Sequence, residues 1–264
     1  MEKLVGLALL PGIVLMAYIY KKDNRDKEPI KLLFSCFLLG VVSVIPAIIL
    51  ELLYGLLGIG DGFVGILLEC IFGVALIEEG CKYVFLKLRT WKNPNFDYSF
   101  DGIVYSVFVS LGFATCENVM YVIKNGFGVG IMRALTAVPG HMCFAVLMGY
   151  FYSGMRFAKN YGDNKAYRRN LKFVLLVPIL VHGFYDAFAM SGSISWIFTV
   201  LFFVLVILMF IFCFRLVNKA SKNDMEIALN PVSALLDENA WMCPECKVYI
   251  RTAFCGNCGS KRPN

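Results

Sequence analysis

Seven long apolar stretches constrain what this chain of 264 residues can fold into more than any other feature. They cover about residues 4–20, 32–57, 63–88, 102–123, 131–157, 172–190 and 194–217. A helix needs roughly 20 apolar residues to cross the hydrocarbon core of a bilayer. Hydrophobic residues make up 59% of the chain, and the mean hydropathy is +0.68. The sequence therefore predicts an all-α polytopic membrane protein with about seven transmembrane helices.

The basic residues predict the orientation of these helices. Connections 21–31, 87–96 and 156–172 contain five, three and six Lys or Arg residues, whereas connections 58–62 and 190–195 contain none. Because Lys and Arg concentrate in cytoplasmic loops, we expect a multi-pass protein of the cell membrane with its N-terminus outside and its C-terminus in the cytoplasm. The first stretch lacks a basic leader and a cleavage site, which predicts a retained span. The same loops explain the net charge of +6, so nucleic-acid binding by the membrane part is not expected.

Four cysteines near the C-terminus have the spacing of a metal site. Cys243 and Cys246 form one C-x2-C pair, and Cys255 and Cys258 form another. Four converging thiolates suit a closed structural Zn²⁺ site, whereas two disulfides are less compatible with a reducing cytoplasm. We expect a transmembrane helical domain at 1–218, a linker at 219–240 and a zinc ribbon at 241–264. A four-Cys site has no open position for catalysis, which favours a regulatory or recognition role with a cytoplasmic partner.

Charged residues interrupt the third apolar stretch at 74-VALIEEGCKYVF-85. In a helix, Glu78 and Lys82 share a face at i,i+4, and Glu79 and Lys82 are neighbours at i,i+3. A charge near the bilayer centre costs about 2.5–3.5 kcal/mol on insertion scales, so the three together require partners or a water-filled cavity. The alternative is an internal ion pair that only fixes helix packing.

Further polar residues occur near the middle of other stretches. The two histidines of the chain, His141 and His182, both lie about ten residues into a stretch, and Asp186 shares a helix face with His182. Glu117 lies in the fourth stretch, with Asn118 and Tyr121 beside it. A carboxylate at i,i+4 can orient an imidazole, and Pro139 with Gly140 should loosen the helix before His141. Polar groups on four separate helices indicate a functional interior.

This set of groups suits hydrolysis of an acyl bond. A buried Glu can take a proton from water, and the imidazoles could stabilise an oxyanion or could hold a metal that activates the water. The absence of GxSxG, HExxH and Walker motifs argues against serine, zincin-type and ATP-driven mechanisms. Glu51 and Glu69 lie toward the outer ends of their stretches, and we assign them no chemistry. Asp101 begins the fourth stretch, where helix capping and a site role are equally open.

The polar residues occur in an order that resembles the PrsW family of intramembrane endopeptidases. The motifs are EExxK at 78–82, FDG at 100–102, ENxxY at 117–121, the lone His141 and HGxxD at 182–186. The similarity begins near Glu28 and covers most of residues 20–190. The family is distantly similar to the type II CAAX prenyl endopeptidases, whose pattern is EExxxR followed by two His-containing helices. Here Lys82 stands one position earlier than that Arg and Asp186 occupies the place of an Asn, which argues against CAAX processing.

The resemblance implies cleavage of a membrane-associated protein within the lipid bilayer, as in the first cut of an anti-sigma factor. It maps an essential Glu pair onto Glu78 and Glu79, and two His residues onto His141 and His182. We predict Glu78 as the base and Glu79 as its support, because Glu78 shares the i,i+4 face with Lys82. The motifs leave open whether the water is activated by Glu alone or by a metal on the histidines. The ribbon lies outside the shared region.

Two other functions fit parts of the sequence. Buried Glu, His and Asp residues also build the proton relays of ion-coupled transporters, although the chain shows no internal repeat of the kind many transporters have. Alternatively, the membrane part could be a scaffold that presents the ribbon to a cytoplasmic partner. Loss of cleavage in Glu78→Gln or His182→Ala is expected only for the peptidase.

Overall fold

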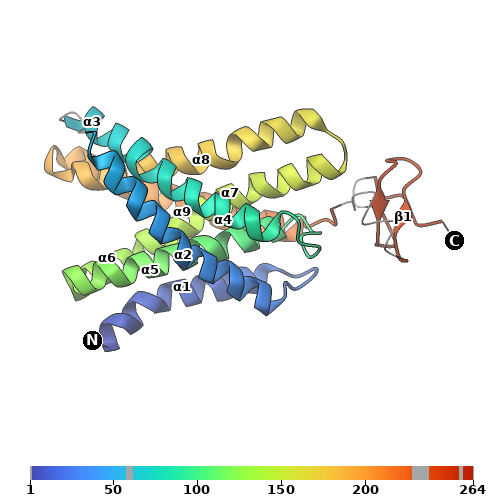
Figure 1. Ribbon diagram of the computed structural model, residues 1–264, viewed down its shortest axis with the longest axis horizontal. Helices are drawn as coiled ribbons and strands as arrows, with labels where there is room; N and C mark the ends of the chain where they lie inside the picture. Colours follow the sequence, from blue (N-terminus) through green and yellow to red (C-terminus); the bar gives the residue numbers. More distant parts are fainter. Residues whose placement is uncertain (1, 58–61, 228–237, 256–257, 264) are drawn as a thin grey trace.

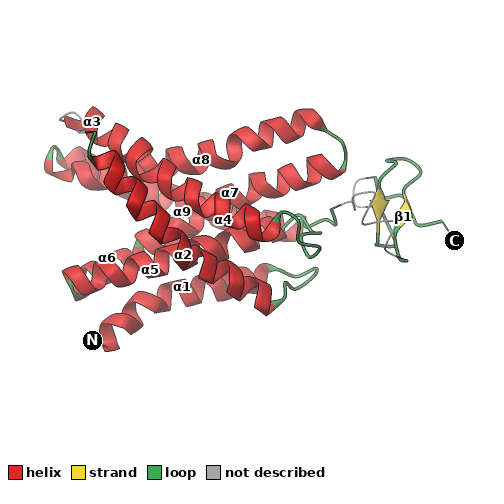
Figure 2. Cartoon of the chain, viewed as in Figure 1, coloured by secondary structure: helices red, strands yellow, loops and turns green. Residues whose placement is uncertain are grey.

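A computed structural model describes residues 2–57, 62–227, 238–255 and 258–263 of the protein. Helices form most of the described chain, and two short strands lie near its C-terminus (Figure 2). The helical segments are α1 Glu2–Lys22, α2 Ile30–Gly55, α3 Gly62–Leu68, the π-helix η1 Glu69–Ala75, α4 Leu76–Thr90, α5 Asp101–Asn125, α6 Phe127–Leu135, α7 Ala137–Asn160, α8 Asn164–Met190, the 3-10 turn η2 Ser191–Ser193 and α9 Trp196–Lys222. The predicted all-α class is confirmed.

All seven predicted spans fall on helical segments. Five of the segments are long and apolar enough to cross a membrane: Ile30–Gly55, Asp101–Asn125, Phe127–Asn160, Asn164–Ser193 and Trp196–Lys222. The third predicted span consists of α3, η1 and α4 in succession and contains the charged residues, so no single apolar helix covers it. The first span corresponds to the 21-residue helix α1. The count of about seven therefore fits the helical path of the chain, with five spans supported by length and composition.

The helices form one bundle, and the chain begins and ends at opposite ends of it (Figure 1). Helix α5 lies at the centre, with 72% of its most apolar window buried, whereas only 22% of the corresponding window of α9 is buried. The exposed side chains of α9 between Val200 and Phe212 are all apolar, as expected for contact with lipid. Helices α5 and α7 pack so closely that a Cβ atom on Gly149 would lie 2.5 Å from the carbonyl oxygen of Gly102.

Two irregular segments shape the middle of the bundle. The π-helix η1 directly precedes α4, and such segments often occur at functional sites. Residue Thr136 separates α6 from α7, with φ −122° and ψ −61°. This break lies three residues before Pro139, whose ring cannot donate a backbone hydrogen bond. Helix α7 is continuous through Pro139, Gly140 and His141, because Pro139 lies in its first turn, where a missing N–H costs no helical hydrogen bond. The predicted loosening directly before His141 is therefore not seen, and the break lies at Thr136 instead.

The C-terminal strands β1 Trp241–Met242 and β2 Tyr249–Ile250 pair antiparallel, with Trp241 opposite Ile250. They pack in a small apolar cluster with Tyr161, which lies in the turn between α7 and α8. Helix α9 continues to Lys222, past the predicted domain boundary at residue 218. Much of the predicted linker 219–240 and residues 58–61 of the connection 58–62 lie outside the described residues. The boundaries at 218 and 240 stay predictions.

Candidate active site

Lys82 is the centre of a polar cluster buried within the bundle. Its Nζ lies 2.9 Å from Glu78 Oε2, 2.8 Å from Glu79 Oε1 and 3.1 Å from His141 Nδ1. An ammonium has three N–H donors, so these three acceptors use its full capacity. The Lys82 side chain is only 1% exposed. The i,i+3 and i,i+4 pairing expected from the sequence is therefore present in the folded protein.

His182 brings α8 to the same cluster. Its Nδ1 lies 3.1 Å from Glu79 Oε1, and its Nε2 lies 3.2 Å from Asp186 Oδ2. Because both ring nitrogens face carboxylates, the geometry fits the doubly protonated imidazolium. Gly183 permits this approach, since a Cβ atom there would lie 2.5 Å from Ile71 Cγ1 in η1. The glycine of the HGxxD motif thus lets α8 pack against the π-helix.

His141 links Lys82 to the fourth predicted span. Its Nδ1 faces the Lys82 ammonium and accepts, so Nε2 carries the proton and donates to Glu117 Oε2 at 3.0 Å. This arrangement is that of a neutral imidazole with a defined tautomer. The two histidine rings are 5.4 Å apart between centroids. Residues from α4, α5, α7 and α8 therefore meet at one place, as the sequence predicts.

Arg133 belongs to this cluster and is not among the predicted site residues. Its Nη2 lies 2.9 Å from Glu117 Oε2, its Nε donates to Asn118 Oδ1 at 3.2 Å, and its guanidinium lies 4.0 Å from the centre of the Tyr121 ring. The three side chains of the ENxxY motif thus all contact one guanidinium. In the sequence Arg133 stands only at the edge of a connection, so its contacts with the preceding helix, such as the one to Asn118 15 positions earlier, are not evident.

The charges of the cluster nearly balance. Four carboxylates face three cationic groups if His182 is an imidazolium, which leaves about one unit of negative charge. The members are Glu78, Glu79, Glu117 and Asp186 against Lys82, His182 and Arg133. Such a network keeps buried charges paired, as the low dielectric of the bilayer interior requires. It also leaves one carboxylate able to accept a proton.

Glu78 and Glu79 differ in their surroundings. Glu79 is fully buried, and its Oε1 accepts from both Lys82 and His182, while its Oε2 has no hydrogen-bond partner among the described residues. Glu78 makes one hydrogen bond, through Oε2 to Lys82, and its side chain is 7% exposed. Its Oε1 makes no hydrogen bond to the described part of the chain. Glu78 therefore has the freer and more accessible oxygen.

Three further acidic residues have other surroundings. Glu69 is exposed, in line with its exclusion from the site. Glu51 is partly buried and close enough to Glu78 and Glu117 to interact with them electrostatically. Asp101 is buried, but its Oδ2 accepts from the backbone N–H groups of Asp97 and Tyr98. Asp101 thus organises the loop before α5, and the N-cap of that helix is the preceding Phe100, which makes no side-chain cap.

Three side chains of the cluster are arranged like metal ligands. Glu78, Glu79 and His141 each offer a ligand atom, and these atoms lie within 4.8 Å of one another. The Lys82 ammonium occupies the space between them, at hydrogen-bond distance from all three. Metal ions such as zinc bind N and O ligands at about 2.0–2.2 Å, so a metal does not fit between these groups while Lys82 is there. His182 is outside the trio, since its two nitrogens face carboxylates.

The four C-terminal cysteines form a second candidate metal centre. Their sulfur atoms all lie within 4.8 Å of one another, with 3.5 Å between Cys243 and Cys258 and 3.8 Å between Cys246 and Cys255. A tetrahedron of thiolates about 2.3 Å from zinc has edges of about 3.8 Å. None of the four is in a disulfide, so the alternative of two disulfides is wrong. Hydrogen bonding to Ser260 lowers the pKa of Cys258 to about 6, which favours the thiolate that metals bind.

The two cysteine pairs have the same local backbone. Lys247 and Gly259, each directly after the second cysteine of a pair, have positive φ values of 55° and 76°. The N–H of each donates to the carbonyl of the first cysteine, at 2.9 Å for Lys247 and 2.8 Å for Gly259. Two like turns thus present four sulfur atoms to one point. The described cluster is compatible with a small zinc ribbon.

The fold and the buried polar cluster together define a membrane-embedded hydrolytic enzyme. Residues 28–214 match a family described as PrsW family intramembrane metalloprotease. The chain is 35% identical over 222 residues to Protease PrsW of Bacillus subtilis (strain 168), covering 84% of this chain and 96% of that protein. It is 34% identical over 206 residues to Protease PrsW of Clostridioides difficile (strain 630), covering 76% of this chain and 85% of that protein. No solved structure matches the chain.

The chain therefore belongs to the PrsW family and is an intramembrane protease. The family match includes every residue of the polar cluster, from Glu78 to Asp186, and ends before the four cysteines of the ribbon. The predicted family and enzyme class are confirmed, and the comparisons do not support the transporter alternative. The ribbon at 241–264 lies beyond the matched residues.

Proposed function

We propose that this protein is an endopeptidase that cleaves a membrane-associated regulatory protein of the anti-sigma type, with Glu78 as the general base. The observation that carries the proposal is the buried network around Lys82. Its Glu78 side chain is 7% exposed, against 0% for Glu79, and Glu78 Oε1 makes no hydrogen bond to the described residues. A carboxylate held in this way can take a proton from a water molecule beside it.

The positions of the groups support the following reaction. Glu78 takes a proton from a water molecule, and the resulting hydroxide attacks the carbonyl carbon of the peptide bond. The cationic groups beside it, Lys82 and the His182 imidazolium, stabilise the negative charge that develops on the carbonyl oxygen. The protonated Glu78 then donates to the nitrogen of the leaving amine, and the products are a carboxylic acid and an amine.

Two pairs of side chains position the reacting groups. Asp186 and Glu79 orient His182 from opposite sides of its ring. Arg133 fixes Glu117, which in turn fixes the tautomer of His141. Because His141 accepts from Lys82, the ammonium stays directed toward the two carboxylates. The family is described as a metalloprotease, and in this side-chain arrangement the cation at the centre of the site is Lys82, so no step is assigned to a metal there.

The depth of the cluster predicts where the substrate is cut. Glu117 lies eight residues before the end of α5, and His182 lies eight residues before the end of α8. Both ends belong to the side of the bundle opposite the ribbon (Figure 1). At 1.5 Å per residue this depth is about 12 Å. We expect cleavage within the substrate span, about eight helical residues from the face opposite the ribbon.

We further propose that the ribbon holds one structural Zn²⁺ on the cytoplasmic side and binds a cytoplasmic partner. The positive loops support this orientation, since connections 21–31, 87–96 and 156–172 all lie at the end of the bundle that contains the ribbon. The N-terminus is then outside. A chain segment this short gains most of its folding free energy from the metal.

The test is cleavage of a co-expressed, epitope-tagged single-span anti-sigma protein that the wild-type enzyme cuts. Glu78→Gln should abolish the fragments while the variant accumulates in the membrane to the wild-type level. Glu69→Gln is the matched control, because Glu69 lies on the same helical path and is exposed. Equal cleavage by Glu78→Gln and wild type would exclude Glu78 as the base.

A further inference from the structure

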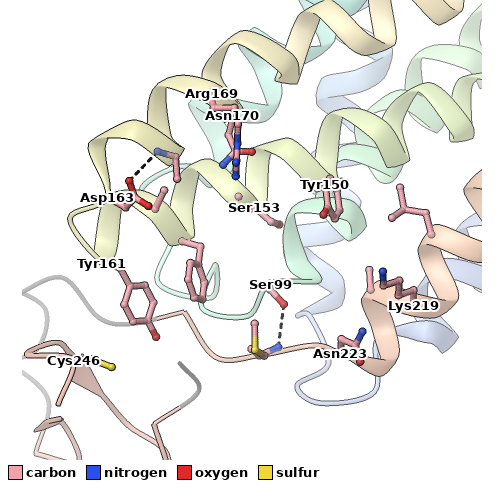
Figure 3. Close-up of a pocket in the computed structure, with 17 residues that line it drawn as sticks. Ser99, Tyr150, Ser153, Tyr161, Asp163, Arg169, Asn170, Lys219, Asn223 and Cys246 are labelled. Atoms are coloured by element: carbon pink, nitrogen blue, oxygen red, sulfur yellow. Dashed lines mark hydrogen bonds between the residues drawn. The ribbon is translucent and has the colours of Figure 1, made fainter. Parts of the chain in front are cut away.

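A cavity of about 720 Å³ lies at the ribbon end of the bundle, between α7, α8 and α9 and separate from the polar cluster. Figure 3 shows its walls, with Tyr150 and Ser153 on α7, Arg169 on α8 and Lys219 on α9. Cys246 of the ribbon also lines it. The ribbon and the segment after α9 therefore form the cytoplasmic wall of the cavity.

Two cationic side chains face this cavity from opposite helices. Arg169 and Lys219 are both exposed, and neither forms an ion pair with a carboxylate in the described part of the chain. Asp163 also lines the cavity, but its carboxylate accepts from the N–H of Ala166 as the N-cap of α8. The charge at the rim is therefore positive and available to an anion.

The rest of the lining suits a ligand with an apolar part. Phe157, Ala158, Leu216 and Ala220 line the walls along α7 and α9. Ser153 adds a buried hydroxyl oxygen, 5% exposed as a residue, that has no hydrogen-bond partner. Since 1.5 Å separates successive helical residues, the lining from Tyr150 to Tyr161 extends about 16 Å along α7. The cavity thus runs from the membrane interface into the apolar part of the bundle.

We propose that this cavity binds one anionic phospholipid, with the phosphate between Arg169 and Lys219 and an acyl chain along α7 and α9. Basic sites between transmembrane helices on the cytoplasmic side are suited to anionic headgroups. The apolar lining along α7 and α9 favours a lipid over a soluble phosphate, because a phosphate alone would leave this part of the cavity unfilled. The bound lipid contacts both the bundle and the ribbon at Cys246 and stabilises their contact.

The experiment measures lipid retention by the full-length purified protein. Native mass spectrometry follows the protein in detergent after incubation with phosphatidylglycerol or phosphatidylcholine, with and without excess glycerol phosphate. We expect retention of one phosphatidylglycerol and little phosphatidylcholine. Arg169→Gln/Lys219→Gln should weaken retention about 30-fold, from about 1 kcal/mol for each of two charges near an anionic headgroup.

A matched control and a second variant separate binding from general effects. Lys165→Gln/Arg168→Gln removes the same charge from exposed positions of α8 outside the lining and should retain the lipid like wild type. Ala220→Phe keeps all charges but fills part of the cavity, and it should also lose the lipid. Equal retention of both lipids, an equal loss in the control, or full displacement by glycerol phosphate would overturn the proposal. Cleavage is not measured, so the outcome does not depend on the proposed base.

Discussion

Replacing Lys82 by Met tests whether this ammonium holds the active site together. The substitution keeps a long side chain of similar volume but removes three hydrogen bonds and the counter-charge of Glu78 and Glu79. Removing one partner of a buried ion pair costs about 3–5 kcal/mol, because an unpaired charge remains. Since Tm shifts by about 2–4 °C per kcal/mol for a chain of this size, we expect Tm to fall by about 10 °C.

The assay is thermal unfolding of the purified protein in detergent together with cleavage of the tagged substrate. Lys87→Met is the matched control, since Lys87 is exposed on the same helix and should change stability by no more than about 0.5 kcal/mol. A triple variant, Glu78→Gln/Glu79→Gln/Lys82→Met, removes all three charges together. It should therefore recover at least half of the stability that Lys82→Met loses, while cleavage stays absent. A Lys82→Met protein as stable and active as wild type would refute the role of Lys82.

Three other predictions concern Arg133, the metal content and Glu28. Arg133→Gln should lower kcat about tenfold or more with little change in KM, because Glu117 loses a charged hydrogen bond. Added guanidinium should restore activity to Arg133→Ala, and equal rescue by ethylammonium would contradict a role for the guanidinium shape. Metal analysis should find one zinc per chain that disappears when the four ribbon cysteines become Ser, and a second zinc that remains would contradict the filled site at Lys82. Burial raises the pKa of Glu28 from 4.5 to about 8. The bound proton therefore stabilises the folded state fully below about pH 4.5, and this contribution is lost as the pH rises through about 8. Glu28→Gln should be more stable than wild type at about pH 9 in thermal unfolding, and a less stable variant at that pH would contradict the raised pKa.

Much of the site could be predicted from the sequence because its signals are local. Charges within an apolar stretch are costly, so Glu78, Glu79 and Lys82 stand out, and helical spacing alone pairs them. The same spacing pairs His182 with Asp186. These pairs have the predicted geometry, with 2.9 Å for Glu78 to Lys82 and 3.2 Å for His182 to Asp186.

Other features depend on how helices pack and could not be predicted. The hydrogen bond between Lys82 and His141 joins residues 59 positions apart. This contact places the Lys82 ammonium between Glu78, Glu79 and His141, where a metal would otherwise bind. The π-helix η1 directly before α4 also leaves no signal in the composition of the sequence. Arg133 looks like a loop residue in the sequence, but the turn at Gly126 begins helix α6, and Arg133 on that helix reaches Glu117 on α5.

Cleavage by the purified protein in proteoliposomes tests the central claim most directly. The substrate is reconstituted with wild type, Glu78→Gln or Glu69→Gln, and the fragments are identified by mass spectrometry. We predict that wild type and Glu69→Gln cut one bond within the substrate span, whereas Glu78→Gln leaves the substrate intact. Fragments of the same mass at the wild-type rate with Glu78→Gln would contradict the assignment of the active site to this buried cluster.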